Sequence, residues 1–191
     1  TRLFIESIYT ETDYTPPAGF IERDGNALIY NGGISWEFAN KLTGNVAVGY
    51  TDRQYDQELF NDVTGVTYRG DMKWDYTQNT TITLGAKRET LDSANEADTG
   101  GFIRNNYSLG YESQITNLIG LSTSFYYEKD TFGASGRLDE RYGAGAELDY
   151  SLKSYLSIIF AYNYRERDSN ISEADFESNI IRLSVVIYTG K

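Results

Sequence analysis

Hydrophobic and polar residues alternate along segments of about ten residues, and such segments recur throughout the chain. The clearest segment spans 156–167, and its apolar face carries Leu156, Ile158, Phe160, Tyr162 and Tyr164. Side chains that change face at every residue define a β-strand. The other face carries Asn163, Arg165 and Arg167, which a packed core would not tolerate. The pattern therefore predicts a strand with one face toward lipid and the other toward water.

The same alternation predicts ten strands, at residues 2–10, 26–39, 44–55, 65–77, 81–90, 102–112, 118–128, 141–152, 156–167 and 179–188. The connectors alternate between short ones, at 40–43, 78–80, 113–117 and 153–155, and long ones, at 11–25, 56–64, 91–101, 129–140 and 168–178. We therefore expect an all-β fold, a transmembrane antiparallel up-and-down β-barrel. All short turns would lie at one, periplasmic, end together with both chain termini.

Aromatic residues fall near the ends of the predicted strands. Those expected near the short turns are Trp36, Trp74, Tyr76 and Tyr150, and those expected near the long loops are Tyr127, Tyr162 and Tyr164. Aliphatic residues such as Val46, Leu84 and Leu183 lie between them. Two aromatic girdles around an apolar band are typical of a bilayer-spanning barrel. A soluble sandwich, the alternative, has no reason to sort its tyrosines by strand end.

The composition fits one domain across residues 1–191, because no linker-like stretch divides the chain. No apolar run is long enough for a membrane-spanning helix. The net charge of −11 argues against a nucleic-acid partner and leaves room for cations and for lipopolysaccharide bridged through them. Cysteine is absent, so there are no disulfides, and strand pairing would have to hold the fold.

Histidine is absent as well, which excludes catalysis by an imidazole base and metal sites built on imidazole or thiolate. A carboxylate pair, Asp71 with Asp75 or Glu147 with Asp149, could still act as acid and base. The alternative is a solvated wall, because Arg and Lys share that face. We expect no enzymatic activity and no cofactor.

The polar strand face is the expected seat of function. The candidate residues for solute selection in the lumen are Arg165, Arg167, Arg182, Arg53, Arg69, Lys73, Glu147 and Asp149. In a narrow barrel such charges would meet and fill the interior, whereas in a wide one they would line water and select solutes. Arg165, Arg167 and Arg182, on the last two predicted strands, should form a positive stripe.

The predicted long loops are acidic. Their carboxylates are Asp56, Glu58 and Asp62; Asp92, Glu96 and Asp98; Asp130, Asp139 and Glu140; and Asp168, Glu173, Asp175 and Glu177. The last group is a weak candidate for a divalent cation site. A plain solvated loop is the alternative, because no EF-hand spacing is present.

Four stretches resemble the C-terminal half of the putative β-barrel porin family of Gram-negative outer membranes. They are NVAVGYTDRQYD, GLSTSFYYEKD, YLSIIFAYNYRERDSN and SNIIRLSVVIY, and the resemblance covers most of the chain from about Asn45 onward. It implies location in the bacterial outer membrane, contact with its lipids, and a channel passing small solutes or surface polysaccharide, since the family is often encoded beside exopolysaccharide or capsule machinery.

Family members are markedly longer, so the resemblance leaves open a natural short version, a fragment or the ordered part of a wider barrel. No signal peptide is visible at Thr1, so we expect a mature or trimmed form. Strands encoded upstream would favour a wide channel. A complete ten-stranded barrel would favour a plugged structural or adhesive surface protein that acts through its acidic loops. The oligomeric state stays open.

Overall fold

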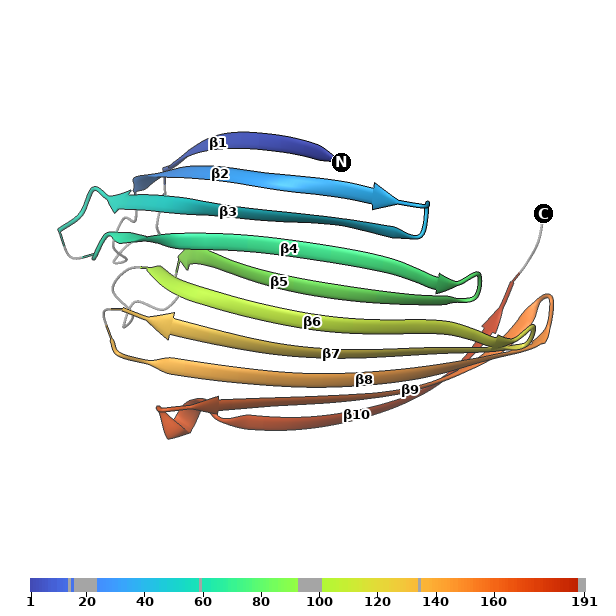
Figure 1. The fold of residues 1–191 in the computed structure, drawn as a ribbon. Helices are drawn as coiled ribbons and strands as arrows, with labels where there is room; N and C mark the ends of the chain where they lie inside the picture. Colours follow the sequence, from blue (N-terminus) through green and yellow to red (C-terminus); the bar gives the residue numbers. More distant parts are fainter. Residues whose placement is uncertain (14, 16–23, 59, 93–100, 134, 189–191) are drawn as a thin grey trace.

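The computed structural model describes residues 1–13, 15, 24–58, 60–92, 101–133 and 135–188. They form one antiparallel sheet in which every strand pairs with its neighbours in sequence (Figure 1). The strands are β1 (Arg2–Thr12), β2 (Gly25–Phe38), β3 (Leu42–Tyr55), β4 (Val63–Thr77), β5 (Thr80–Asp92), β6 (Gly101–Thr116), β7 (Ile119–Phe132), β8 (Leu138–Lys153), β9 (Leu156–Ser169) and β10 (Phe176–Ile187). A short 3-10 helix, η1 (Ser172–Ala174), precedes β10. The ten predicted strands are thus confirmed.

Tight turns join every second pair of strands at one end of the sheet (Figure 1). In the β2–β3 hairpin, Ala39 and Asn40 have φ angles of 51° and 53°, and the Lys41 amide donates to the Phe38 carbonyl at 3.0 Å. This geometry is a type I′ turn, whose twist matches that of the strands. The other three tight hairpins each have a register shift in the strand before the turn, which is a β-bulge.

Several strands are longer than the hydrophobic alternation indicates. The connector predicted at 129–140 is mostly strand, because β7 continues to Phe132 and β8 begins at Leu138. β6 likewise continues to Thr116, beyond the predicted end at residue 112, and β10 begins earlier, at Phe176. Both faces of these extensions are largely polar, so they lack the alternation by which a strand is recognised.

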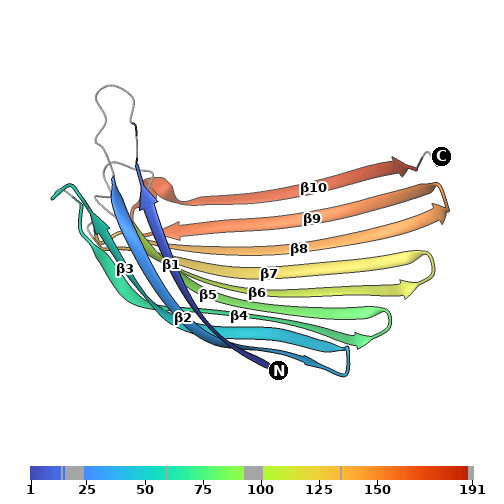
Figure 2. The same ribbon diagram turned by 90° about the horizontal axis from the view of Figure 1, so that it is seen from above.

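The sheet is strongly curved (Figure 2). Strands β1 and β4 are separated by β2 and β3, which on a flat sheet would place them about 14 Å apart. Arg69 on β4 nevertheless reaches Glu6 on β1 at 3.3 Å, and its guanidinium lies 5.8 Å from the centre of the Phe4 ring. The polar face is therefore the concave one.

The described sheet is open. No pairing joins β1 to β10, so the closed barrel expected from the sequence is not seen in these ten strands. Their curvature does not bring the two outer strands together (Figures 1 and 2).

The sheet also has no second layer to pack against within the described residues. The buried apolar side chains there are Ala27, Ala47, Phe60, Phe102, Phe132 and Ala161. Ile5 on β1 is 93% exposed, and Leu183 on β10 is 71% exposed. No helix in the described part of the chain has the length and apolarity needed to cross a membrane. The fold therefore positions two sheet faces rather than a hydrophobic core.

Candidate functional site

The convex face carries an apolar band. On β8 this face presents Tyr142, Ala144, Ala146, Leu148 and Tyr150. Among the described residues of this face, the charged side chains of the strands lie at or beyond the rows of aromatic residues at the two ends. The innermost is Arg88 on β5, a strand without aromatic residues, and it lies directly opposite Tyr68 in the loop-end row. Tyr142 and Tyr150 are eight residues apart, which corresponds to about 26 Å along an extended strand. At the tilt of about 35 to 45° that strands have in membrane barrels, this length spans about 20 Å of membrane thickness, slightly less than an apolar band about 25 Å tall.

Tyrosines border this band at the long-loop end. The rings of Tyr107, Tyr127 and Tyr142 form a row across β6, β7 and β8, with centroids 6.2 Å and 5.1 Å apart. Both Tyr127 and Tyr142 donate a hydrogen bond to Glu140, at 3.0 Å and 3.1 Å. Their rings thus lie on the apolar band while their hydroxyls are bonded to a charged group, as at an interface between apolar and aqueous surroundings.

The other predicted girdle residues share this face. Tyr162 donates to Asn179 at 2.6 Å and Tyr164 donates to Glu166 at 2.7 Å, both at the loop end. At the opposite end the Trp74 and Tyr76 rings meet edge to face at 5.0 Å. Trp36 covers Gly44, where any larger residue would collide with the indole. The arrangement fits two girdles, but contact with a membrane interface stays a prediction.

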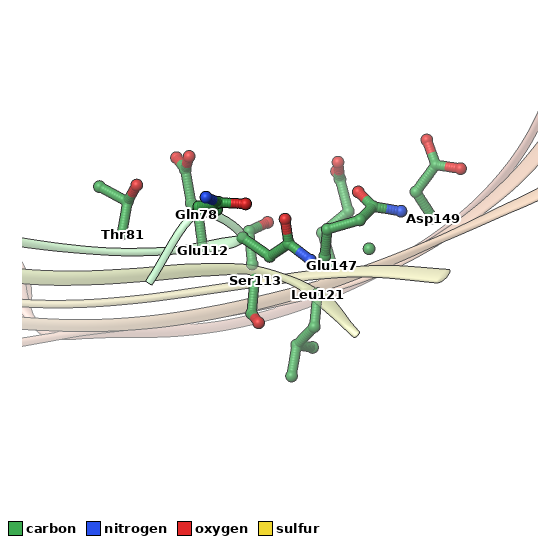
Figure 3. A pocket seen from close by; sticks show the side chains of 11 residues that line it. Gln78, Thr81, Glu112, Ser113, Leu121, Glu147 and Asp149 are labelled. Atoms are coloured by element: carbon green, nitrogen blue, oxygen red, sulfur yellow. The ribbon is translucent and has the colours of Figure 1, made fainter. Parts of the chain in front are cut away.

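The concave face is hollowed above a floor of small residues. One hollow of about 440 Å³ lies near the short turns and includes Glu112, Ser122, Glu147 and Asp149 in its lining. In Figure 3, Glu112, Glu147 and Asp149 rise on one side of the sheet and Leu121 points to the other. A second hollow of about 630 Å³ continues over Gly110, Ser124, Gly145 and Asn163. Small side chains leave this space open.

Glycines on the concave face accommodate two aromatic rings. A Cβ at Gly143 would collide with the ring of Tyr126 on the neighbouring strand, and a Cβ at Gly33 would collide with Phe4. Each ring therefore lies against the backbone of the next strand instead of projecting across the wall. Glycine is required at these two positions because of this close approach.

Near the long loops, the concave face holds a network of ion pairs, which we call the arginine cluster (Arg104, Arg137, Arg141 and Arg167, with Glu128, Asp130 and Asp139). Asp139 is fully buried and accepts hydrogen bonds from Arg137 at 3.0 Å and 2.9 Å, Arg167 at 2.6 Å and Ser169 at 2.7 Å. Asp130, also fully buried, accepts two from Arg104, each at 2.8 Å, and one from Arg141. The cluster joins β6, β7, β8 and β9.

The predicted positive stripe is not present as a group of free cations. Arg167 is bonded to Asp139, and Arg182 reaches Glu147 on β8 at 2.9 Å. Arg165 lies opposite Ser178 and has no ion pair within the described residues. Acidic partners on β8 thus neutralise two of the three cations, Arg167 on the adjacent strand and Arg182 two strands away, which the spacing along β9 and β10 alone cannot reveal.

The other selectivity candidates are also largely paired. Arg53 is bonded to Asp92 at 2.6 Å, Arg69 to Glu6 at 3.3 Å and Lys73 to Asp75 at 3.3 Å. Asp149 accepts a hydrogen bond from Ser151 at 3.4 Å. Both carboxylate pairs considered for acid and base chemistry contain one member held by a cation, Asp75 or Glu147. This arrangement is that of a charged wall.

Several carboxylates assigned to loops lie in strands instead. They are Asp92, Asp130, Asp139, Glu140, Asp168 and Glu177. Asp62, in the β3–β4 connection, accepts a hydrogen bond from the Tyr55 amide at 3.0 Å. Glu96 and Asp98, and the stretch 16–23 of the first long connector, lie outside the described residues.

The candidate cation site at Asp168, Glu173, Asp175 and Glu177 is not assembled. The described part of the chain contains no group of three or more carboxylates that could hold a metal ion. Asp175 instead accepts a hydrogen bond from the Ser169 amide at 2.7 Å, which joins the β9–β10 connection to the end of β9.

Sequence reasoning missed the roles of Asp130, Asp139 and Arg137. The available signal was parity, because counting in twos from Glu128 leads to Asp130, and from Arg141 to Asp139, on the same concave face. Because both faces of the extensions of β7 and β8 carry charges, the apolar–polar alternation that identifies a strand is absent there. Tyr126 was missed because a polar wall was not expected to contain an aromatic ring lying on glycine.

Comparison with known proteins agrees with this arrangement. A comparison with curated proteins found no match to the chain. The family profile described as "Putative beta-barrel porin 2" matches residues 1–189, which is nearly the whole chain. The alternating hairpins, the apolar convex band and the polar concave wall are the features expected of a porin-type β-barrel. The chain therefore belongs to the Putative beta-barrel porin 2 family.

Proposed function

We propose that this chain builds part of the wall of an outer-membrane channel through which small hydrophilic solutes diffuse. The observation that supports this most strongly is the contrast between the two sheet faces. The convex face has an uncharged apolar band bordered by aromatic residues, whereas the concave face carries charges, hydroxyls and glycines. A lipid-facing exterior and a hydrated interior account for both faces together.

The family implies an outer-membrane barrel, and the membrane adds a requirement to the proposal. Backbone groups at the free edges of β1 and β10 would have no water to bond in the hydrocarbon region. The proposal therefore includes further strand pairing at both edges, either with each other or with other strands. Outer-membrane lipid would contact the apolar band, with lipopolysaccharide at the long-loop end.

The hollows on the concave face support an open path along at least part of the wall. Their floor of Gly110, Ser122, Ser124 and Gly145 leaves room for hydrated solutes. Sugars are within this class, and surface polysaccharide is the larger cargo that the resemblance suggests. Swelling of protein-containing liposomes in sugars of increasing size would separate the two, because a polysaccharide path admits oligosaccharides that a small-solute pore excludes.

A second candidate function is a plugged structural or adhesive surface barrel. The arginine cluster favours it, because paired charges occupy the loop end of the concave face and leave few free groups there. The hollows nearer the short turns favour the channel. We therefore keep the channel as the main proposal.

The test is conductance of the purified full-length protein in a planar lipid bilayer. A channel should give stepwise currents, and unheated protein should migrate differently from boiled protein on a detergent gel because a paired strand ladder resists detergent. Folded protein that inserts and carries no current would contradict the channel and support the plugged barrel.

A further inference from the structure

Ion pairing divides the concave wall into two halves of different charge. In the loop half, the carboxylates of Glu128, Asp130 and Asp139 all contact arginines of the arginine cluster. Closer to the middle, Lys87 contacts Glu89 at 2.6 Å. Arg165 is the cation of this half that has no ion-pair partner in the described part of the chain. Most of the positive charge of the loop half is therefore balanced, and a small positive excess is left, because the cluster has four arginines for three carboxylates and Arg165 is unpaired.

The turn half has the opposite imbalance. Glu37 on β2, Asp71 on β4, Glu112 on β6 and Asp149 on β8 face the concave side and make no ion pair with any described residue. Among the described residues, Arg2 at the start of β1 and Lys41 in the β2–β3 turn are cations of this end that make no ion pair. Because the four carboxylates outnumber them, the free charge of the turn half is negative.

Two of these free carboxylates share one hollow. Glu112 and Asp149 line the hollow of about 440 Å³ together with Glu147, whose charge is balanced by Arg182 at 2.9 Å (Figure 3). The amides of Gln78, Asn79 and Gln114 also line it. Ser122 lies on its floor, directly opposite Glu112 in the β6–β7 register and Glu147 in the β7–β8 register. A low-dielectric concave wall concentrates the field of such charges.

We propose that the concave wall is a cation-favouring charge filter whose negative half lies at the short-turn mouth. Small hydrated cations, including organic ammonium ions, are concentrated there and small anions are depleted. This inference rests on the proposed channel, and it replaces the positive stripe of Arg165, Arg167 and Arg182 expected from the sequence as the feature that selects solutes. The neutralised arginines, as much as the free carboxylates, set the sign of the filter.

The test measures the local potential with a thiol probe. Because residues 1–191 contain no cysteine, Ser122→Cys introduces a single thiol into them at the hollow, and Ser178→Cys introduces one opposite Arg165 as the matched control. Each full-length variant reacts with a cationic (trimethylammonium) or an anionic (sulfonate) methanethiosulfonate in detergent. We expect the cationic-to-anionic rate ratio at position 122 to exceed that at position 178 about tenfold at low salt.

Two further measurements complete the test. Adding Glu112→Gln and Asp149→Asn to Ser122→Cys should lower the ratio toward that at position 178, and high salt should lower it as well. Equal ratios at the two positions, or a ratio that survives neutralisation, would overturn the charge filter. The gel shift of unheated protein verifies folding of each variant. The rates of thiol modification can be measured whether or not the protein conducts. Absence of conductance would therefore contradict the channel, whereas equal rate ratios would contradict the charge filter.

Discussion

Replacing Asp139 with asparagine should destabilise the full-length protein far more than replacing its sequence neighbour Glu140 with glutamine. Asp139 is fully buried on the concave face and contacts three guanidinium groups, those of Arg137, Arg141 and Arg167, whose side chains are 13%, 21% and 19% exposed. The asparagine variant keeps the size of the side chain but removes the charge that balances these arginines. Its amide group would also present hydrogens toward a guanidinium donor.

The magnitude follows from burial. Removing one partner of a buried ion pair costs about 3 to 5 kcal/mol, because the remaining charge is left without compensation away from water. Glu140 lies on the opposite face, where its side chain is 28% exposed and Lys129, its partner at 2.9 Å, is 37% exposed. A pair of that kind contributes about 0.2 to 1 kcal/mol. The loss in the free energy of unfolding should therefore be larger for Asp139→Asn than for Glu140→Gln by about 2 kcal/mol or more.

The assay is urea unfolding of the two variants and the wild type from lipid vesicles. Trp36 and Trp74 lie at the short-turn end of the sheet, far from the substituted residue at the loop end. Their fluorescence therefore reports global unfolding. Circular dichroism in the β region verifies that each variant folds before urea is added. Equal losses in the two variants, or a wild-type unfolding free energy for Asp139→Asn, would refute the assigned role of the arginine cluster.

Two other substitutions test the faces of the sheet. Ile158→Arg, in the apolar convex band, should cost about 2 to 4 kcal/mol in vesicles, whereas Asn163→Arg, on the concave face of the same strand, should cost much less; similar losses would mean that the faces are misassigned. Gly143→Ala should destabilise the protein by displacing the Tyr126 ring, and this loss should shrink when Tyr126 is first replaced by alanine; an undiminished loss in that double-mutant cycle would exclude the ring as its cause.

Much of the concave wall could be predicted from the chain by parity. Arg53, Arg69, Arg165 and Arg182 all lie on the predicted face, since strands place every second residue on one side. Their partners could not be predicted, because they are set by the register between strands. Glu6 meets Arg69 only because the sheet curves across β2 and β3. Whether a charge is free or balanced is thus a property of the assembled sheet.

The sequence by itself determined the ten strands, the alternation of short and long connectors, and the side of the sheet on which each strand residue lies. These features depend on the local alternation of apolar and polar residues. Shifting a strand by one residue would move all its side chains to the wrong face. The tertiary structure alone decided that Asp130 and Asp139 are buried anions rather than loop carboxylates. It also decided that Arg167 and Arg182 are neutralised. Ion pairs join residues distant in sequence, and their geometry comes from register and curvature, which no single strand encodes.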